Sequence, residues 1–187
     1  MKNELTNDIL KVLYTEDQIR KRVGELGAAL AERFAGKQPL FVGILKGSVV
    51  FLADLIRACP LRADLEMMAV SSYGNATASS GRVRITYDIP QDVRDRDLII
   101  VEDILDSGNT LSFLKEYLKA KGAASITIVT LLDKPSGRQK AVTADYIGFT
   151  VPDAFVVGYG LDYAQLYRNL PCIGILKPEV YEKPDRE

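Results

Sequence analysis

Apolar residues recur at helical spacing in the first part of the chain, from about Thr15 to Phe34. They follow one another every three or four residues, which is the spacing of one face of an α-helix. Thr15 and Gln18 form the pattern of a capping box at its start, and Gly36 and Pro39 close the segment. We therefore predict an amphipathic helix whose apolar face consists of Ile19, Val23, Leu26, Leu30 and Phe34.

Short, continuous apolar runs alternate with helical segments along the rest of the chain. Runs of this kind are typical of strands buried in a parallel sheet. A second helix is expected up to about Arg57, and a third from about Thr110 to Lys121, where Gly122 ends it. The predicted strands are Leu40–Leu45, Leu65–Ser71, Arg82–Asp88, Leu98–Val101, Ile126–Leu132, Tyr146–Phe149, Phe155–Val157 and Ile173–Leu176.

This alternation of strands and helices predicts an α/β protein with a largely parallel sheet. The chain contains no repeat, no low-complexity tract and no linker, so we expect residues 1–187 to form one domain. Ser72–Gly81 is rich in small and polar residues and is expected to be a mobile loop, with Arg82–Asp88 as one arm of a ribbon beside it. Glu182–Glu187 is polar and is expected to fray.

Composition excludes several classes of function. The 24 basic and 25 acidic residues give a net charge of −1, which argues against a nucleic-acid partner. The chain has no histidine, so Ser-His-Asp catalysis, histidine-ligated metals and histidine bases are excluded. Its two cysteines, Cys59 and Cys172, form neither a disulfide framework nor a zinc site, and we expect reduced thiols in the cytoplasm. No apolar run approaches the ~18 residues of a membrane span, so no membrane partner is expected.

The segment that follows the predicted strand ending near Val101 carries the chemistry, because ligands of open α/β sheets gather at the carboxyl ends of the strands. Gly108 permits a loop whose amides point inward, and Ser107 and Thr110 add hydroxyls just before a helix begins. This combination is typical of a phosphate site. It is not a Walker A loop, because the turn contains no lysine.

Two adjacent acids, Glu102 and Asp103, precede that loop. Paired carboxylates accept hydrogen bonds from vicinal hydroxyls, as on a ribose, and help to hold a hydrated Mg²⁺. Together with the loop they predict a pocket for a ribose 5-phosphate. The alternative is that Asp106 caps the helix and that the other two acids are solvated.

Val101–Thr110 resembles the phosphoribosyl diphosphate signature of the type I phosphoribosyltransferases. Further segments, in the same order, resemble the 6-oxopurine branch of that family, the bacterial hypoxanthine-guanine phosphoribosyltransferases. The resemblance implies the type I phosphoribosyltransferase fold, a mostly parallel sheet flanked by helices, with a small hood over the base site formed by about 1–14 and 150–187. The matching segments are Leu45–Ser48, Ser71–Gly74, Leu132–Lys134 and Val151–Tyr163, and Arg168 falls where the family keeps an arginine that contacts diphosphate.

The resemblance implies transfer of phosphoribosyl from 5-phospho-α-D-ribose 1-diphosphate to N9 of hypoxanthine or guanine, with Mg²⁺ as cofactor. The products would be IMP or GMP and diphosphate, and the family suggests a homodimer or homotetramer. The implied site has Asp106 as the catalytic residue; Glu102, Asp103, Asp106, Ser107, Gly108, Asn109 and Thr110 for the phosphoribosyl group; Lys46, Gly47 and Arg168 for the diphosphate; Ser72 and Tyr73 at the start of a lid; Lys134, Phe155, Val156 and Asp162 for the base; and Glu102, Asp103 and Asp162 for the metal.

Several of these residues have a plainer alternative. Lys46, for which the resemblance implies a preceding cis peptide, also fits an ordinary turn with a surface lysine. Lys134 also fits a solvated loop lysine, Phe155 a core aromatic residue and Asp162 a turn residue. Asn109 stands where some relatives have a basic side chain, which puts one phosphate contact in doubt.

Two other functions compete with the implied one. The first is a regulatory protein of the same fold that senses phosphoribosyl diphosphate and binds RNA or DNA, and it predicts a basic face or an added DNA-binding domain. The second is an enzyme of the same class that prefers xanthine or guanine.

Overall fold

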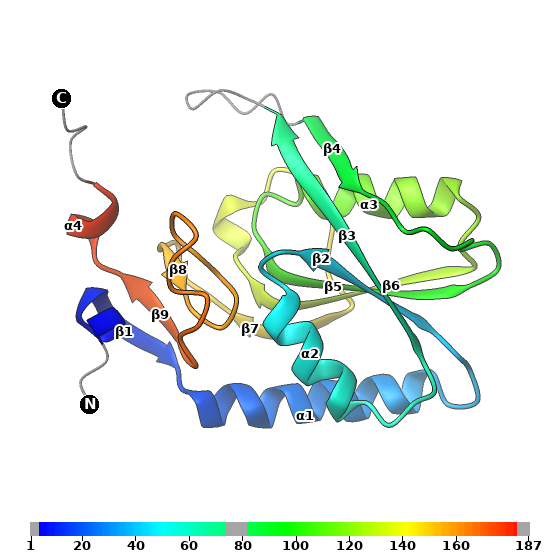
Figure 1. Cartoon of the computed structure of the whole chain (residues 1–187), viewed down its shortest axis with the longest axis horizontal. Coiled ribbons are helices and arrows are strands. Elements are labelled where there is room, and N and C mark those ends of the chain that lie inside the picture. The colour runs from blue at the N-terminus through cyan, green and yellow to red at the C-terminus, as the bar shows by residue number, and fades with distance from the viewer. Residues whose placement is uncertain (1–3, 74–81, 183–187) are drawn as a thin grey trace.

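We analysed a computed structural model of the chain, which describes residues 4–73 and 82–182 (Figure 1). Two sheets organise the fold, one of six strands and one of three. The strands are β1 (Ile9–Tyr14), β2 (Leu40–Leu45), β3 (Asp64–Tyr73), β4 (Arg82–Tyr87), β5 (Asp97–Leu105), β6 (Ser125–Asp133), β7 (Tyr146–Thr150), β8 (Val156–Val157) and β9 (Ile173–Leu176). The helices are α1 (Glu16–Arg33), α2 (Val49–Ala58), α3 (Asn109–Ala120) and α4 (Pro178–Tyr181), with 3₁₀ turns η1 (Glu4–Asp8) and η2 (Pro135–Gly137).

The large sheet has the strand order β4-β3-β2-β5-β6-β7. All its strands are parallel to their neighbours except β4, which pairs antiparallel with β3. Helices α1 and α2 cover one face and α3 covers the other (Figure 1). The predicted fold class is therefore confirmed, and so is the ribbon formed by β3 and β4.

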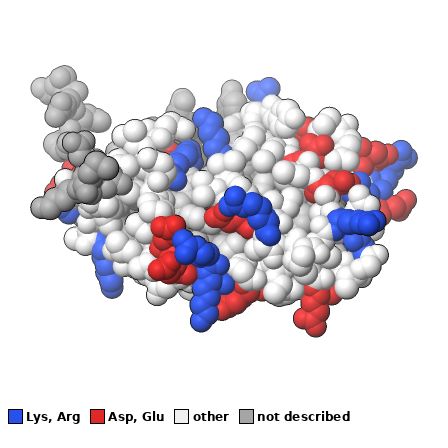
Figure 2. Space-filling model, turned by 60° about the horizontal axis from the view of Figure 1, so that its bottom comes forward, with Lys and Arg blue, Asp and Glu red and all other residues white. Residues whose placement is uncertain are grey.

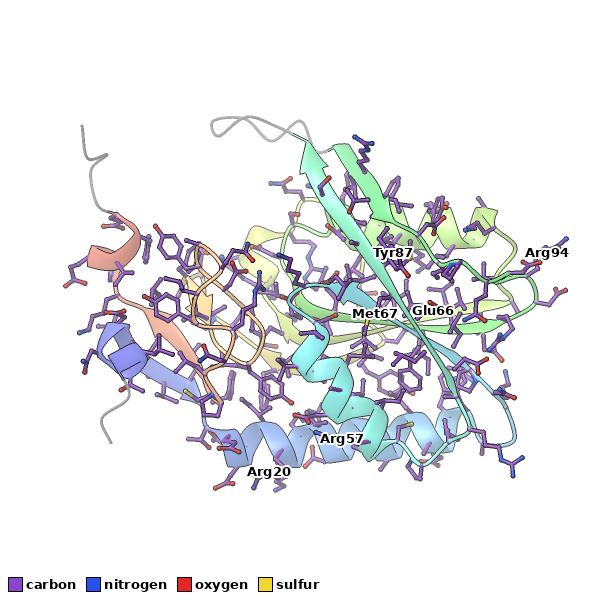
Figure 3. All side chains as sticks on the ribbon, viewed as in Figure 1. Arg20, Arg57, Glu66, Met67, Tyr87 and Arg94 are labelled. Carbon is purple, nitrogen blue, oxygen red and sulfur yellow. The ribbon has the colours of Figure 1, made fainter. Side chains whose placement is uncertain are left out.

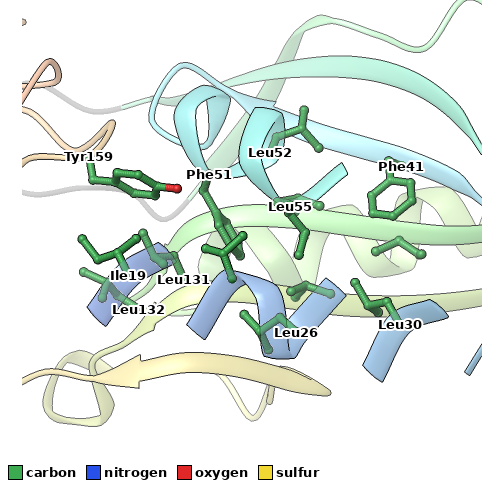
Figure 4. Packing of buried hydrophobic residues seen from close by; sticks show 14 of the residues in the cluster. Ile19, Leu26, Leu30, Phe41, Phe51, Leu52, Leu55, Leu131, Leu132 and Tyr159 are labelled. Atoms are coloured by element: carbon green, nitrogen blue, oxygen red, sulfur yellow. The ribbon is translucent and has the colours of Figure 1, made fainter. Parts of the chain in front are cut away.

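The predicted first helix forms as α1, and the residues of its apolar face are all buried. Both hydrogen bonds of the capping box are present, from Gln18 N–H to the Thr15 hydroxyl and from Thr15 N–H to the Gln18 side chain. The helix packs against α2 and one face of the sheet, where Phe51 and Phe41 fill the layer between them (Figure 4).

Two of the strands that extend beyond their predicted ends, β5 and β3, change where candidate site residues lie. β5 continues to Leu105, because β6 extends the hydrogen-bonded ladder as far as the pair Leu105–Asp133. The prediction that it ends near Val101 is therefore wrong, and Glu102 and Asp103 lie inside the strand. β3 includes Ser72 and Tyr73, so the expected loop does not start at Ser72, and residues 74–81 lie outside the described part of the chain.

The three-stranded sheet has the order β1-β9-β8 and joins the two ends of the chain. Its parts lie together at one side of the molecule, with α4 beyond β9 (Figure 1). The Tyr167 hydroxyl donates to Asp8 at 2.7 Å, and the Tyr14 hydroxyl donates to the Thr150 carbonyl at 2.8 Å. These contacts join segments more than 130 residues apart, so this small sheet forms only in the folded chain.

Candidate active site

The candidate site lies where β2, β5 and β6 end and where the small sheet approaches them. A cavity of 310 Å³ opens there, and it continues into a second one of 470 Å³. Both cavities are lined by Asp103, Ile104, Asp106 and Asp162. The sequence-predicted residues that line the first are Lys46, Gly47, Glu102, Asp103, Asp106, Ser107, Gly108, Thr110, Asp162 and Arg168.

The loop between β5 and α3 forms one wall of the first cavity. Gly108 has φ +81° and ψ −1°, a left-handed conformation that glycine adopts without strain, and α3 begins at the next residue. The Ser107 hydroxyl accepts a hydrogen bond from the Asn109 N–H at 3.3 Å. Because the residue that caps α3 is Gly108, the alternative that Asp106 serves as the helix cap is wrong. The start of α3 thus borders the cavity, and the start of a helix is a favourable position for an anion.

The turn after β2 forms the opposite wall. The Leu45–Lys46 peptide is cis, as the resemblance implied, and Lys46 is exposed. Gly47 is buried, and a Cβ at this position would overlap the Asp103 carboxylate. On the other side, a Cβ on Gly160 would overlap the Gly47 carbonyl oxygen. Three separate segments therefore meet at Gly47, and the close approach leaves no room for a side chain.

Glu102 is buried, with 7% of its surface exposed, so the alternative of a solvated acid is wrong for this residue. Burial, and then the neighbouring Asp103 carboxylate, raise the pKa of Glu102 well above its usual range. Burial also raises the pKa of Asp103. One Glu102 oxygen, Oε2, is buried without a hydrogen-bond partner. Two adjacent carboxylates with an unsatisfied oxygen form a hard-oxygen donor set, which fits a divalent cation such as Mg²⁺.

The Asp162 carboxylate contacts Arg168 and Gln165. Its Oδ1 lies 2.7 Å from the Arg168 guanidinium, and its Oδ2 accepts a hydrogen bond from the Gln165 N–H. Over residues 4–73 and 82–182, the structure brings together no group of three or more side chains of the types that ligate metals. Asp162 therefore borders the same cavity as Glu102 and Asp103 without joining them in a cluster of ligands.

Arg168 and Lys46 are the cations of the first cavity. Besides Asp162, Arg168 contacts the Gly160 carbonyl at 2.8 Å and the Gln165 side-chain oxygen at 3.3 Å. The Lys46 ammonium donates to the same Gln165 oxygen at 3.3 Å. Two positive side chains from distant parts of the sequence thus converge in the cavity that the loop between β5 and α3 borders.

The second cavity is lined by every residue expected to contact the base: Lys134, Phe155, Val156 and Asp162. Lys134 follows β6, and only 17% of its side chain is exposed. Its ammonium lies 3.0 Å from Asp153 and 3.8 Å from Asp106. The alternative of a solvated lysine is therefore wrong. Phe155 is 39% exposed, which excludes the alternative of a core aromatic residue.

Arg138, which the sequence did not single out, forms a brace behind the loop between β5 and α3. Arg138 donates to the backbone oxygens of Asp106 at 2.9 Å, Leu105 at 3.2 Å and Val142 at 2.6 Å, and it also pairs with the Asp133 carboxylate. The local sequence does not reveal the contacts with Leu105, at the end of β5, and with Asp106, just after it, because both residues are more than 30 positions away from Arg138.

The turn after β6 also holds the side chain of Asn109. The Asn109 amide donates to the Gln139 side-chain oxygen at 3.2 Å, and the Gln139 N–H donates to the Ser107 carbonyl at 2.9 Å. Asn109 is not among the residues that line the first cavity. Its side chain therefore links the phosphate loop to the neighbouring turn.

A larger hollow of 710 Å³ lies between α1, α2 and the loop that ends at Pro171. Arg20 and Arg57 mark its rim on the two helices (Figure 3). Both are paired with carboxylates of their own helices, Arg20 with Glu16 and Asp17, and Arg57 with Asp54. Since its charges are already neutralised within the protein, this hollow is a weaker candidate than the paired cavities.

Residues 11–164 match the phosphoribosyl transferase domain family. The chain is 56% identical to the hypoxanthine-guanine phosphoribosyltransferase of Bacillus subtilis, over 95% of this chain and 99% of that protein. It is 53% identical to the bifunctional protein TilS/HprT of Listeria innocua over 95% of this chain, but it spans only 27% of that relative's length.

A crystal structure of a hypoxanthine phosphoribosyltransferase from Staphylococcus aureus superposes with a TM-score of 0.94. It shares 47% identity with this chain and covers 98% of it, and the chain covers 100% of that structure. Sequence and fold thus agree over nearly the whole chain. The chain belongs to the phosphoribosyltransferase family, in its hypoxanthine-guanine phosphoribosyltransferase branch.

Proposed function

We propose that the chain transfers phosphoribosyl from 5-phospho-α-D-ribose 1-diphosphate to N9 of hypoxanthine or guanine, giving IMP or GMP and diphosphate. It is a purine salvage transferase. The observation that carries the proposal is the junction of the two cavities at Asp106, because the predicted phosphate loop there adjoins a compartment that contains the mostly buried Lys134 ammonium. A phosphoribosyl donor and a 6-oxopurine need these two environments side by side.

In this proposal the loop 106–110 binds the 5-phosphate. Its amides, the Ser107 and Thr110 hydroxyls and the start of α3 supply donors to a dianion. Glu102 and Asp103 accept hydrogen bonds from the ribose hydroxyls. Lys46, Gly47 and Arg168 contact the diphosphate, whose negative charge grows as it leaves.

Glu102 and Asp103 would also hold Mg²⁺, with Asp162 nearby. Mg²⁺ usually keeps several waters and binds one or two carboxylates together with substrate oxygens, so two protein ligands suffice. When bound, the ion supplies charge neutralisation for the departing diphosphate. The buried Glu102 oxygen without a hydrogen-bond partner supports this assignment.

The purine would stack on Phe155 and contact the Val156 backbone, while Lys134 donates to its O6. Hypoxanthine and guanine carry an acceptor at this position, whereas adenine carries an amino group, which would place a second hydrogen-bond donor against the ammonium. Asp106, 3.8 Å from Lys134, would take or stabilise the proton at N7 of the base. No protein nucleophile is required, since the transition state has oxocarbenium character.

A lid starting at Ser72 and Tyr73 would close over the bound substrates. Excluding water protects the activated sugar from hydrolysis. These two residues end β3, which pairs with β4 at the edge of the large sheet. The small sheet formed by β1, β8 and β9 would serve as the hood over the base.

A panel of four bases tests the proposal. Purified protein is assayed with phosphoribosyl diphosphate, Mg²⁺ and hypoxanthine, guanine, xanthine or adenine, and nucleotide formation is measured. We expect turnover with hypoxanthine and guanine and none above background with adenine. Absence of nucleotide from all four bases would overturn the proposal, and a marked preference for xanthine would favour the xanthine-preferring alternative.

The regulatory alternative needs a basic surface. Figure 2 shows positive and negative side chains interspersed on the face in view, which gives that face no basic stripe.

Over residues 4–73 and 82–182, no helix is long and apolar enough to cross a membrane. We further propose a homodimer or homotetramer in the cytoplasm, where Cys59 and Cys172, both free thiols, would stay reduced. Sedimentation or light scattering of the purified protein decides the oligomeric state.

A further inference from the structure

Three aromatic side chains meet at the outer end of the base compartment. Tyr181 stacks on Phe155 with ring centroids 5.1 Å apart and an interplanar angle of 25°. Tyr163 meets Phe155 edge-on at 5.5 Å and Tyr181 at 6.4 Å. We call this group the aromatic triad. Phe155 and Tyr181 both line the second cavity, although their positions in the sequence are distant.

The same C-terminal segment also holds the backbone of Phe155. The Leu176 N–H donates to the Phe155 carbonyl at 2.9 Å, and β8 pairs with β9 from the next residue onward. Lys177 donates its N–H to the Asp8 carbonyl at 2.9 Å, which attaches the start of α4 to the N-terminal turn. Figure 1 shows α4 directly beyond β9 in this corner of the molecule. Backbone and ring of Phe155 are therefore fixed by one segment, 176–181.

An aromatic ring in an open cavity binds a planar ligand well only if its orientation is set beforehand. Phe155 is 39% exposed, so the walls of the cavity alone do not hold it. A stacked ring on one face and an edge contact with a second ring fix its plane, and both geometries are favourable for aromatic pairs. Fixing a binding group in advance removes part of the entropy cost of association.

We infer that Tyr181 is a positioning residue for the purine. It acts through Phe155, whose ring it holds in the plane that a bound base requires. This inference rests on the proposed function, because it takes the ligand of the second cavity to be a purine. It adds to the site a C-terminal residue that neither the signature loop nor the hood motif contains.

Kinetics of three substitutions test the inference. Tyr181→Ala removes the side chain, and Tyr181→Leu keeps apolar bulk without a ring. In both variants KM for hypoxanthine should rise about 2- to 10-fold, the factor expected when one aromatic pair is lost. KM for phosphoribosyl diphosphate should not change. Tyr181→Phe keeps the ring and should have the wild-type KM, because the described structure gives the Tyr181 hydroxyl no hydrogen bond.

Direct binding separates positioning of the base from general damage. GMP should bind the Tyr181→Ala and Tyr181→Leu variants more weakly by the same factor, whereas ribose 5-phosphate, which lacks a base, should bind them like the wild type. Val180→Ala serves as the matched control. Val180 precedes Tyr181 on α4 and packs against the same apolar cluster, but it has no ring.

Each outcome is decisive. Wild-type KM and GMP affinity in the Tyr181→Leu variant would overturn the inference, and so would equal losses for GMP and ribose 5-phosphate. A lower KM for hypoxanthine would mean that the Tyr181 ring occupies the place of the base, which also contradicts it. A wild-type protein without activity on any base would instead contradict the proposed function.

Discussion

The Lys134 ammonium lies 3.8 Å from a carboxylate oxygen of Asp106, although β5 and β6 bring these residues from different parts of the chain. The Lys134 N–H also donates to the Leu105 carbonyl at 2.9 Å, which fixes the start of the following turn. The cation that would donate a hydrogen bond to O6 thus lies close to the carboxylate that would accept or stabilise a proton at N7. Since O6 and N7 share one edge of a 6-oxopurine, this pair suits that edge.

Replacing Lys134 tests specificity. Lys134→Gln removes the charge and supplies an amide with both a donor and an acceptor. We expect kcat/KM for hypoxanthine to fall about 10- to 100-fold, as for loss of one charged hydrogen bond of ~1.5–3 kcal/mol. The ratio of hypoxanthine to adenine use should narrow. Steady-state kinetics with both bases measure this ratio. The control is Lys119→Gln, at an exposed position on α3. An unchanged ratio would contradict the role of Lys134 in recognising O6.

Replacing Asp106 tests the proton step. Asp106→Asn keeps the shape of the side chain and removes its basicity, so kcat should fall by roughly 10²–10⁴ if proton transfer contributes to the transition state. The Kd for phosphoribosyl diphosphate should change much less. Single-turnover kinetics together with donor titration separate the two effects. If kcat stays at the wild-type value, Asp106 only shapes the loop.

A methyl group at Gly47 should disrupt the site without disrupting the fold. In Gly47→Ala the new Cβ overlaps the Asp103 carboxylate, so that carboxylate or the turn must shift. We expect kcat/KM for the donor to fall at least about 10-fold, the cost of one displaced charged contact. Gly24→Ala is the matched control, because nothing lies within 4 Å of a Cβ there. Equal activity of the two variants would show that the Gly47 contact is dispensable.

The brace formed by Arg138 should matter for activity as well as stability. Arg138→Lys keeps the charge but cannot make the same set of contacts with Leu105, Asp106 and Val142. We expect a lower kcat with little change in either KM, and a lower Tm. Arg96→Lys, which weakens the 2.6 Å pair with Asp64 on another part of the surface, should lower Tm without lowering kcat. A kcat effect of the same size in both variants would argue against a specific brace.

Metal removal tests the role of the acidic pair. Activity should disappear in EDTA and return when Mg²⁺ is added, because the charge of the diphosphate needs a hard divalent partner beside Glu102 and Asp103. The control is Ca²⁺, which is larger and prefers more ligands, and it should restore less activity. Full turnover in metal-free buffer would rule out the assignment.

The amino-acid sequence by itself determined the elements whose signals are local. The apolar periodicity and capping box of α1, the buried runs of β2 and β6, and the glycine at the start of α3 each lie within one short segment. The signal of such a segment lies in its own residues, so the pattern of the sequence is enough to predict it. The segment predicted to bind phosphate has the same local character, because the residues that suggest this role all lie within 102–110.

Only the tertiary structure decided the features that depend on partners distant in sequence. β5 runs on to Leu105 because β6 continues the ladder beside it. Lys134 is an ion-paired, mostly buried side chain because Asp106 and Asp153 approach it from two other segments. Arg138 contacts the end of β5 and the residue after it, and Tyr181 contacts Phe155, so both gain their roles in the same way. A residue's own neighbours in sequence cannot specify such contacts, since they arise when the sheets close and bring distant strand ends together.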